Sequence, residues 1–274
     1  MDNSKQDERV AERATTIEHN AQAWNKLARR GVALARPAVD ADFGEPLKTV
    51  DPLGWLGPSI ADRQVLCLAA GGGRQGPLYA KAGAHVIVLD ISSEMLALDR
   101  EVAEERGLNV QTVQGSMDDL SMFADNQFDI VIHPVSTCYV PDVAPVFREV
   151  ARITRAGGLY VSQHKSPVSL QGESQTVSEG LRLSEPYYRS GPLPAAELGR
   201  VRENGTLEYL HRWEELVGGI CRSGFVVEDL VEPVHADEAA ESGTFGHRSQ
   251  FVAPYVRIKA RRTDLSERSL LVSV

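Results

Sequence analysis

Short apolar runs alternate with segments of helical periodicity from residue 64 onward. Five runs end in turn-forming or polar residues, namely QVLCLAA (64–70), HVIVLD (85–90), VQTVQG (110–115), FDIVIH (128–133) and LYVSQH (159–164). Between them, segments such as SSEMLALDREVAEERG (92–107) and VAPVFREVARITRAGG (143–158) carry apolar residues at helical spacing. This alternation predicts an α/β fold, in which a doubly wound, mainly parallel sheet is covered by helices on both faces.

The last part of the chain departs from this rhythm. A helix around 209–222 is followed by the apolar runs FVVEDLVEPV (225–234) and QFVAPYVRIKARR (250–262). The polar segment between these runs has room for only a turn or two of helix, so the two strands form an antiparallel pair. The whole sheet is therefore expected to have seven strands, with the antiparallel pair at its C-terminal end.

Two regions lie outside the alternating pattern and suggest boundaries. Residues 1–60 are interpreted as an N-terminal helical cap, in which Ile17, Ala21, Trp24 and Ala28 share one helix face. Residues 61–165 and 209–263 are expected to form the core. Residues 166–208, rich in Ser, Gly, Pro and Glu, are an insertion expected to cover the substrate site, and 264–274 form a tail.

Composition and charge narrow the function classes. The 274 residues include 42% hydrophobic and 24% charged residues, and the net charge of −9 argues against a protein that grips nucleic acid. The N-terminus is too charged for a secretory signal and no apolar run is long enough to cross a membrane, which favours a cytoplasmic protein without a membrane partner. Three separated cysteines with no CxxC pair are expected as reduced, buried thiols, no metal site is expected, and monomer and homodimer both remain open.

The stretch VLCLAAGGGRQGP at 65–77 carries the first chemical signal. Gly71, Gly73 and Gly76 match the GxGxxG spelling of a dinucleotide-binding turn, and Asp90 ends the next apolar run. An acid at the end of a second strand is placed to take the ribose hydroxyls of an adenosine cofactor. An NAD(P)-dependent oxidoreductase therefore remains an alternative at this point, as do a glycine turn without a ligand and Asp90 as a helix N-cap.

Four motifs in order resemble the class I AdoMet-dependent methyltransferases. These are VLCLAAGGG, HVIVLDISSEML, VQGSMDDLSMFADNQFDIVIHPVS and ARITRAGGLYVS, and they span roughly residues 64 to 163. More narrowly, LCLAAGGG is similar to the LCLASGGG-like loop of a bacterial subgroup. The resemblance implies AdoMet as cofactor, held by Ala69, Ala70, Gly71, Gly72 and Gly73 at the methionine part, Asp90 and Ile91 at the ribose and adenine, Ser116, Met117 and Asp118 at the adenine edge, with His133 and Trp24 also in contact.

Two positions depart from the family pattern. Cys67 stands where many members have an acid, and Ser116 stands where the adenine loop usually has one. These departures keep a non-catalytic AdoMet-binding protein open as another alternative. If Cys67 merely lacks the usual carboxylate, Cys67→Asp is expected to leave cofactor binding intact or improve it.

The acceptor is expected to be a small molecule that attacks the methyl carbon in line. His133 and His164 end the fourth and fifth apolar runs and are candidates for a general base or a positioning residue, against a structural role for either. The motif HPVS at 133–136 differs from the Asn/Asp-Pro-Pro-aromatic sequence of nucleobase-methylating relatives, which disfavours a nucleobase acceptor. Candidates to line the acceptor pocket are Ser136, Tyr139, Tyr187, Tyr188 and His211, although aromatic residues in such segments often serve packing alone.

Overall fold

A seven-stranded mixed sheet forms the centre of the molecule. The computed structural model describes residues 3–174, 176–177, 180–196 and 201–263. The strand order is β3-β2-β1-β4-β5-β7-β6. Strand β7 runs in the opposite direction to the other six, so it pairs antiparallel with both β5 and β6. The strands are β1 (Gln64–Leu68), β2 (His85–Asp90), β3 (Val110–Gln114), β4 (Phe128–His133), β5 (Thr154–Lys165), β6 (Phe225–Val231) and β7 (Tyr255–Arg262). The predicted fold class and antiparallel C-terminal pair are confirmed.

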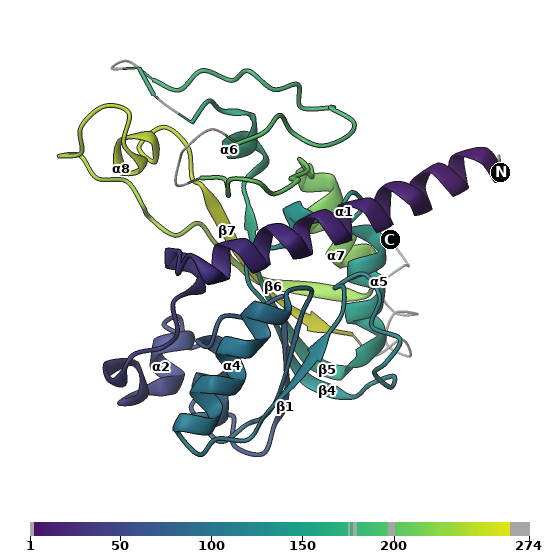
Figure 1. Ribbon diagram of the computed structural model, residues 1–274, viewed down its shortest axis with the longest axis vertical. Helices are drawn as coiled ribbons and strands as arrows, with labels where there is room; N and C mark the ends of the chain where they lie inside the picture. The colour runs from purple at the N-terminus through teal and green to yellow at the C-terminus, as the bar shows by residue number, and fades with distance from the viewer. Residues whose placement is uncertain (1–2, 175, 178–179, 197–200, 264–274) are drawn as a thin grey trace, which may run out of the picture.

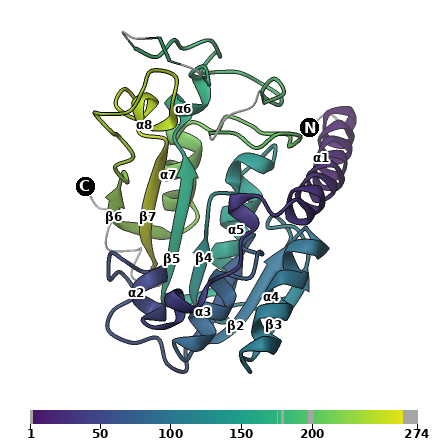
Figure 2. The same cartoon turned by 60° about the vertical axis from the view of Figure 1, so that its left-hand side comes forward.

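Helices cover both faces of this sheet (Figures 1 and 2). One apolar layer packs α5 and α7 against the sheet through residues such as Phe147 and Ile220, and the other packs α3 and α4 through Tyr79 and Leu96. The helices are α1 (Asn3–Arg29), α2 (Pro46–Val50), α3 (Gln75–Lys81), α4 (Ser93–Glu105), α5 (Ala144–Ile153), α6 (Pro167–Gln171), α7 (Trp213–Arg222) and α8 (Phe245–Arg248), with 3-10 turns η1 (Ala33–Ala35), η2 (Asp40–Phe43) and η3 (Thr137–Tyr139). The central strands β1 and β4 are mostly apolar because both of their faces are largely buried.

Several element boundaries differ from the sequence expectation, those of α7 and β5 among them. The helix expected from residue 209 begins at Trp213, because the preceding residues run extended to Arg212, whose backbone N–H is capped by the side chain of Glu215 at 2.8 Å. The fifth strand begins at Thr154 rather than after the Gly-Gly pair, and Phe128 of β4 pairs with Thr154 across a register shift. The expected tail, 264–274, lies outside the described residues.

The helix α1 is fastened across the end of the sheet at which β4 and β5 terminate. Asn20, which is fully buried, donates to the carbonyl oxygens of Tyr139 and Leu207, each at 3.0 Å, and accepts the Leu207 N–H at 2.8 Å. Thr16 is hydrogen bonded to the Tyr209 hydroxyl at 2.8 Å. These contacts join α1 to the segment that follows β5, so both lie over the same end of the sheet (Figure 1).

Candidate active site

The glycine loop after β1 is compact because it runs directly against α4. A Cβ on Gly71 would lie 2.8 Å from Cβ of Met95, and a Cβ on Gly73 would lie 2.8 Å from the Leu98 carbonyl oxygen. Gly73 also has a φ of +72°, a left-handed conformation that favours glycine. Both glycines are therefore required by the close approach of the loop to the helix.

Asp90 fixes this loop from the end of β2. Its Oδ2 accepts the Gly71 N–H at 3.0 Å and its Oδ1 accepts the Ser92 N–H at 2.9 Å. Burial raises the pKa of Asp90 to about 6, against the backbone N–H groups of Ser92 and Gly71, which lower it. The N-cap of α4 is Ser92, whose hydroxyl accepts the Met95 N–H at 3.1 Å, so Asp90 remains available on the loop side.

A second carboxyl group, which the sequence did not reveal, holds the next residue of the loop. Asp99 of α4 is fully buried and its Oδ2 accepts the Gly72 N–H at 2.9 Å. Burial raises the pKa of Asp99 to about 7, and among the described residues its Oδ1 has no hydrogen-bond partner. Cys67 is also fully buried, and burial together with the charge of Asp99 raises the pKa of its thiol well above the usual value. A carboxyl group thus reaches the loop from α4 rather than from the Cys67 position.

A cavity of about 370 Å³ opens between this loop, α1 and the segment after β5. Its size and its mostly apolar walls are typical of a small-ligand site. Ten of the residues predicted for cofactor or acceptor line it: Trp24, Ala69, Ala70, Gly71, Gly72, Asp90, Ile91, Met117, Ser136 and Tyr139. The sequence did not point to several further wall residues, namely Arg36, Arg74, Gln75, Met95, Gln163, Glu203 and Tyr255.

Four of the residues assigned to the cofactor are not on the cavity wall, namely Gly73, Ser116, Asp118 and His133. Gly73 supports the turn, and Ser116 donates to Asp118. Both oxygens of Asp118 are occupied by Arg13 of α1, with the Arg13 Nη2 at 2.9 Å from Oδ1. Asp118 therefore serves to anchor α1 in this structure.

Both histidines that were candidates for a base are fully buried in the protein interior. His133 Nδ1 lies 2.7 Å from the Tyr160 hydroxyl, while His164 lies 2.9 Å from Thr137 Oγ1 and 2.8 Å from Ser162 Oγ. Burial lowers the pKa of each histidine to about 3. The structure brings neither ring to the cavity wall, because these strand positions face the packed layer beneath α5.

The other aromatic candidates line a separate hollow on the outer side of α1. Tyr187, Tyr188 and His211 lie there beside Arg13 and Asp118. The two tyrosine rings meet edge to face at 5.3 Å, and His211 Nε2 lies 3.0 Å from the Val140 carbonyl oxygen. The structure therefore divides the predicted acceptor residues between two places, with Ser136 and Tyr139 at the cavity and these three outside it.

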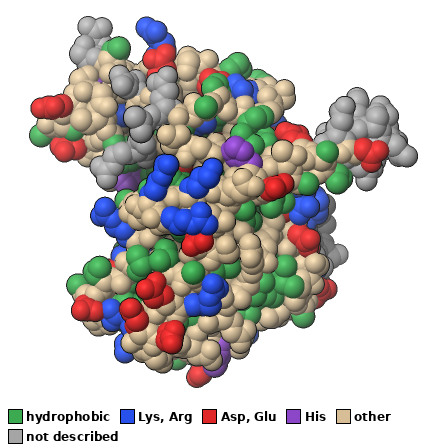
Figure 3. Space-filling view, in the orientation of Figure 1, with side chains coloured by type: hydrophobic (Ala, Val, Ile, Leu, Met, Phe, Trp, Pro, Cys, Tyr) green, Lys and Arg blue, Asp and Glu red, His purple; other side chains and the backbone are tan. Residues whose placement is uncertain are grey.

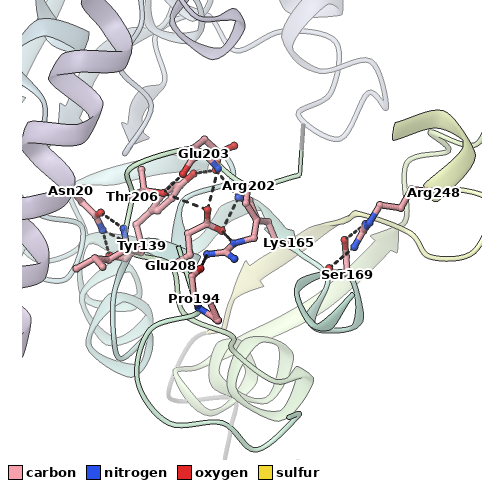
Figure 4. Close-up of polar contacts among 11 residues, drawn as sticks. Asn20, Tyr139, Lys165, Ser169, Pro194, Arg202, Glu203, Thr206, Glu208 and Arg248 are labelled. Atoms are coloured by element: carbon pink, nitrogen blue, oxygen red, sulfur yellow. Dashed lines mark hydrogen bonds and ion pairs between the residues drawn. The ribbon is translucent and has the colours of Figure 1, made fainter. Parts of the chain in front are cut away.

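A buried ion cluster forms the wall of the cavity contributed by the segment after β5 (Figure 4). Lys165 Nζ lies 2.6 Å from Glu203 Oε2 and 3.0 Å from Glu208 Oε2, and the side chains of Lys165 and Glu208 are at most 1% exposed. Arg202 Nε is 3.4 Å from the same Glu208 oxygen. The Tyr139 hydroxyl donates to Glu203 Oε2. The two cations and two carboxylates balance, and Glu203 is the carboxylate that reaches the cavity.

The described residues show neither a membrane-spanning helix nor a metal-binding cluster. Within the part of the chain that the structure describes, no helix is long and apolar enough to span a membrane. In the same residues no cluster of three or more His, Cys, Asp or Glu side chains is arranged to hold a metal ion.

The parallel sheet, the glycine loop and the carboxyl group ending β2 define a protein that binds a nucleoside-containing cofactor at the strand ends. A family model described as "Methyltransferase domain" matches residues 66–162. The chain is 38% identical over 231 residues to the uncharacterized methyltransferase YbaJ of Bacillus subtilis, covering 79% of this chain and 90% of that protein. The chain belongs to the class I AdoMet-dependent methyltransferases, and its cofactor is S-adenosylmethionine.

Solved structures show the same fold. An S-adenosylmethionine-dependent methyltransferase from Mesorhizobium loti matches with a TM-score of 0.62 at 19% identity, over 80% of this chain and all of that one. A similar protein from Listeria monocytogenes matches with a TM-score of 0.62 at 17% identity, over 78% and 96% of the two chains. Among curated relatives, a ubiquinone biosynthesis O-methyltransferase of Aeromonas salmonicida is 30% identical over 125 residues, or 44% of this chain and 52% of that one.

Proposed function

We propose that this enzyme transfers a methyl group to a small molecule bound inside the cavity, beside the cofactor. The observation that carries the proposal is that α1 and the segment after β5 cover part of this cavity. Asn20 ties α1 to both η3 and Leu207, so the walls around Tyr139 and Glu203 are covered by chain rather than open to a large surface. A covered, mostly apolar cavity suits a small acceptor better than a protein or nucleic acid.

The cavity residues fit S-adenosylmethionine. Asp90 uses one lone pair of each carboxylate oxygen on Gly71 and Ser92, so each oxygen can still accept a ribose hydroxyl. Ile91 and Met117 would offer apolar contacts to the adenine, and the backbone of Ala69 to Gly72 would hold the methionine part. When bound, the cofactor supplies an electrophilic methyl group on sulfonium sulfur, and the protein aligns the acceptor and excludes water.

The charge distribution supports an acceptor other than nucleic acid. On the face shown in Figure 3, acidic and basic side chains are interspersed, and basic ones gather mainly around the C-terminal end of α1, whose last turn holds Lys26 and Arg29. The net charge of −9 would oppose a phosphate backbone. The buried thiols of Cys67 and Cys138 are consistent with the cytoplasm as the location of the protein, whereas Cys221, contrary to the expectation that all three are buried, is exposed.

A fractionation experiment tests the acceptor class. Purified enzyme is given methyl-labelled AdoMet together with either the dialysable or the retained fraction of a cell lysate. We expect the label in dialysable products only, and an Asp90→Ala control should transfer none, because that carboxyl group is assigned to the ribose. Label in protein or nucleic acid would contradict the proposal.

A further inference from the structure

The geometry points to Glu203 as the group that recognises the methyl acceptor and takes its proton, which assigns to the acceptor a neutral hydroxyl or amine on an apolar body. This inference rests on the proposed function, since it places the acceptor in the same cavity. It also assigns the role of base to Glu203 and not to the two buried histidines.

Glu203 has one occupied and one open carboxylate oxygen. Oε2 receives Lys165 Nζ at 2.6 Å and the hydroxyl of Tyr139. Among the described residues, Oε1 has no hydrogen-bond partner, and Glu203 lines the cavity with a side chain that is 12% exposed. A carboxylate held firmly on one side and open on the other is suited to accept a hydrogen bond from a ligand.

The neighbouring ionisable groups are not suited to accept a proton. Burial alone lowers the pKa of Lys165, but the negative groups around it, Glu203 and Glu208 among them, raise it overall, so its ammonium keeps its charge. Burial and the charge of Glu203 raise the pKa of Tyr139 well above the usual value, so its hydroxyl stays a donor. Glu208 is fully buried and does not line the cavity. Oε1 of Glu203 is therefore the atom that is suited to accept the proton.

The other residues that line the cavity near Glu203 indicate that the rest of the acceptor is apolar. Tyr139, Val135 and Tyr255 contribute aromatic and apolar surface, and Gln163 adds an amide. A negatively charged acceptor would meet the carboxylate of Glu203 in a covered site, where like charges repel more strongly than in water. A neutral hydroxyl or amine would instead donate to it.

The acceptor's oxygen or nitrogen forms its bond to the methyl carbon while the carbon–sulfur bond breaks with its electron pair on sulfur. The proton that the acceptor loses passes to Glu203 Oε1 and from there to solvent.

A matched set of probes tests the assignment by binding. Protein saturated with AdoHcy is titrated calorimetrically with para-tert-butylphenol, para-tert-butylaniline and para-tert-butylbenzoate, which share one apolar body. We expect the phenol and the aniline to bind about tenfold or more tightly than the benzoate, which corresponds to about 1.4 kcal/mol. Equal binding of the benzoate, or no binding by any probe, would overturn the assignment.

Two variants locate the effect. Glu203→Gln should remove the discrimination against the benzoate and leave AdoHcy affinity unchanged, while Glu101→Gln, an exposed site on α4, should change neither. Loss of AdoHcy affinity in Glu203→Gln would assign Glu203 to the cofactor and overturn the inference, with the proposed function intact. If Glu203→Gln does not fold, Glu203→Asp, which keeps a charge facing Lys165 but withdraws it by one methylene, should weaken phenol binding by about tenfold; unchanged phenol binding would overturn the inference.

Discussion

The stability of the folded protein should depend on pH through the buried carboxyl group of Asp99. Its pKa is raised from 3.8 to about 7 because burial disfavours the ionised form. A carboxyl group with a raised folded-state pKa gives its full stability below the unfolded value and loses it as the pH rises through the folded value. The folded protein should therefore lose stability through Asp99 between about pH 4 and about pH 7.

The substitution that isolates this effect is Asp99→Asn. The amide oxygen can still accept the Gly72 N–H, which is 2.9 Å away in the native protein, but the group no longer ionises. A shift of about three pKa units at about 1.36 kcal/mol each gives a cost of about 4 kcal/mol for the ionised native side chain at most. The variant should therefore equal the native protein in stability at low pH and exceed it by a few kcal/mol above about pH 7.

The measurement is the free energy of unfolding from urea titrations at a series of pH values. Asp90 also has a raised pKa. Because the charge of Asp90 is one of the causes that raise the pKa of Asp99, the difference between the two proteins reports Asp99 together with its coupling to Asp90. Asp119→Asn is a control of opposite sign, because the Ser121 hydroxyl and N–H lower the pKa of that exposed carboxyl group. A stability difference that does not change with pH would refute the reasoning.

Three further predictions use other contacts. Cys67→Asp should lower the melting temperature, because it adds a second buried carboxyl group near Asp99. Asp99→Asn in the same chain should restore the melting temperature. If the effects of the two substitutions simply add, the coupling between the two positions is contradicted. His133→Ala should cost about 1–3 kcal/mol of stability by leaving the Tyr160 hydroxyl without its partner, yet keep AdoHcy affinity in calorimetry; a loss of affinity would return His133 to the site. Asn20→Ala should speed both AdoHcy release and proteolytic cleavage within α1, because three backbone groups lose their partner; unchanged rates would show that α1 does not hold the cavity closed.

The fold was predictable because it depends on repeated local patterns. Five apolar runs with helices between them allow few topologies other than a doubly wound sheet, and the missing crossover before β7 identified the antiparallel strand. The end of β2 and the glycine loop could be predicted for the same reason, since Asp90 and Gly71 are fixed by their positions at strand ends. His133 and His164 also stand at strand ends, but their side chains lie on the face that packs beneath α5 and not at the cavity. Side chains alternate between the two faces along a strand, and the sequence alone did not reveal which face these two would take.

The rest of the site comes from contacts between segments distant in sequence, which no local pattern specifies. Asp99 reads as an ordinary polar residue of an amphipathic helix until the loop packs against that helix and its carboxyl group meets Gly72. Glu203 stands in an insertion that the sequence places over the substrate site without indicating which of its residues reach it, and it gains a role because Lys165 at the end of β5 holds it beside Tyr139. Recognition of the acceptor would thus depend on the segment after β5, and binding of the cofactor on the glycine loop and the end of β2. Substitutions confined to 201–208 are therefore expected to change which acceptor is used while leaving AdoHcy affinity intact.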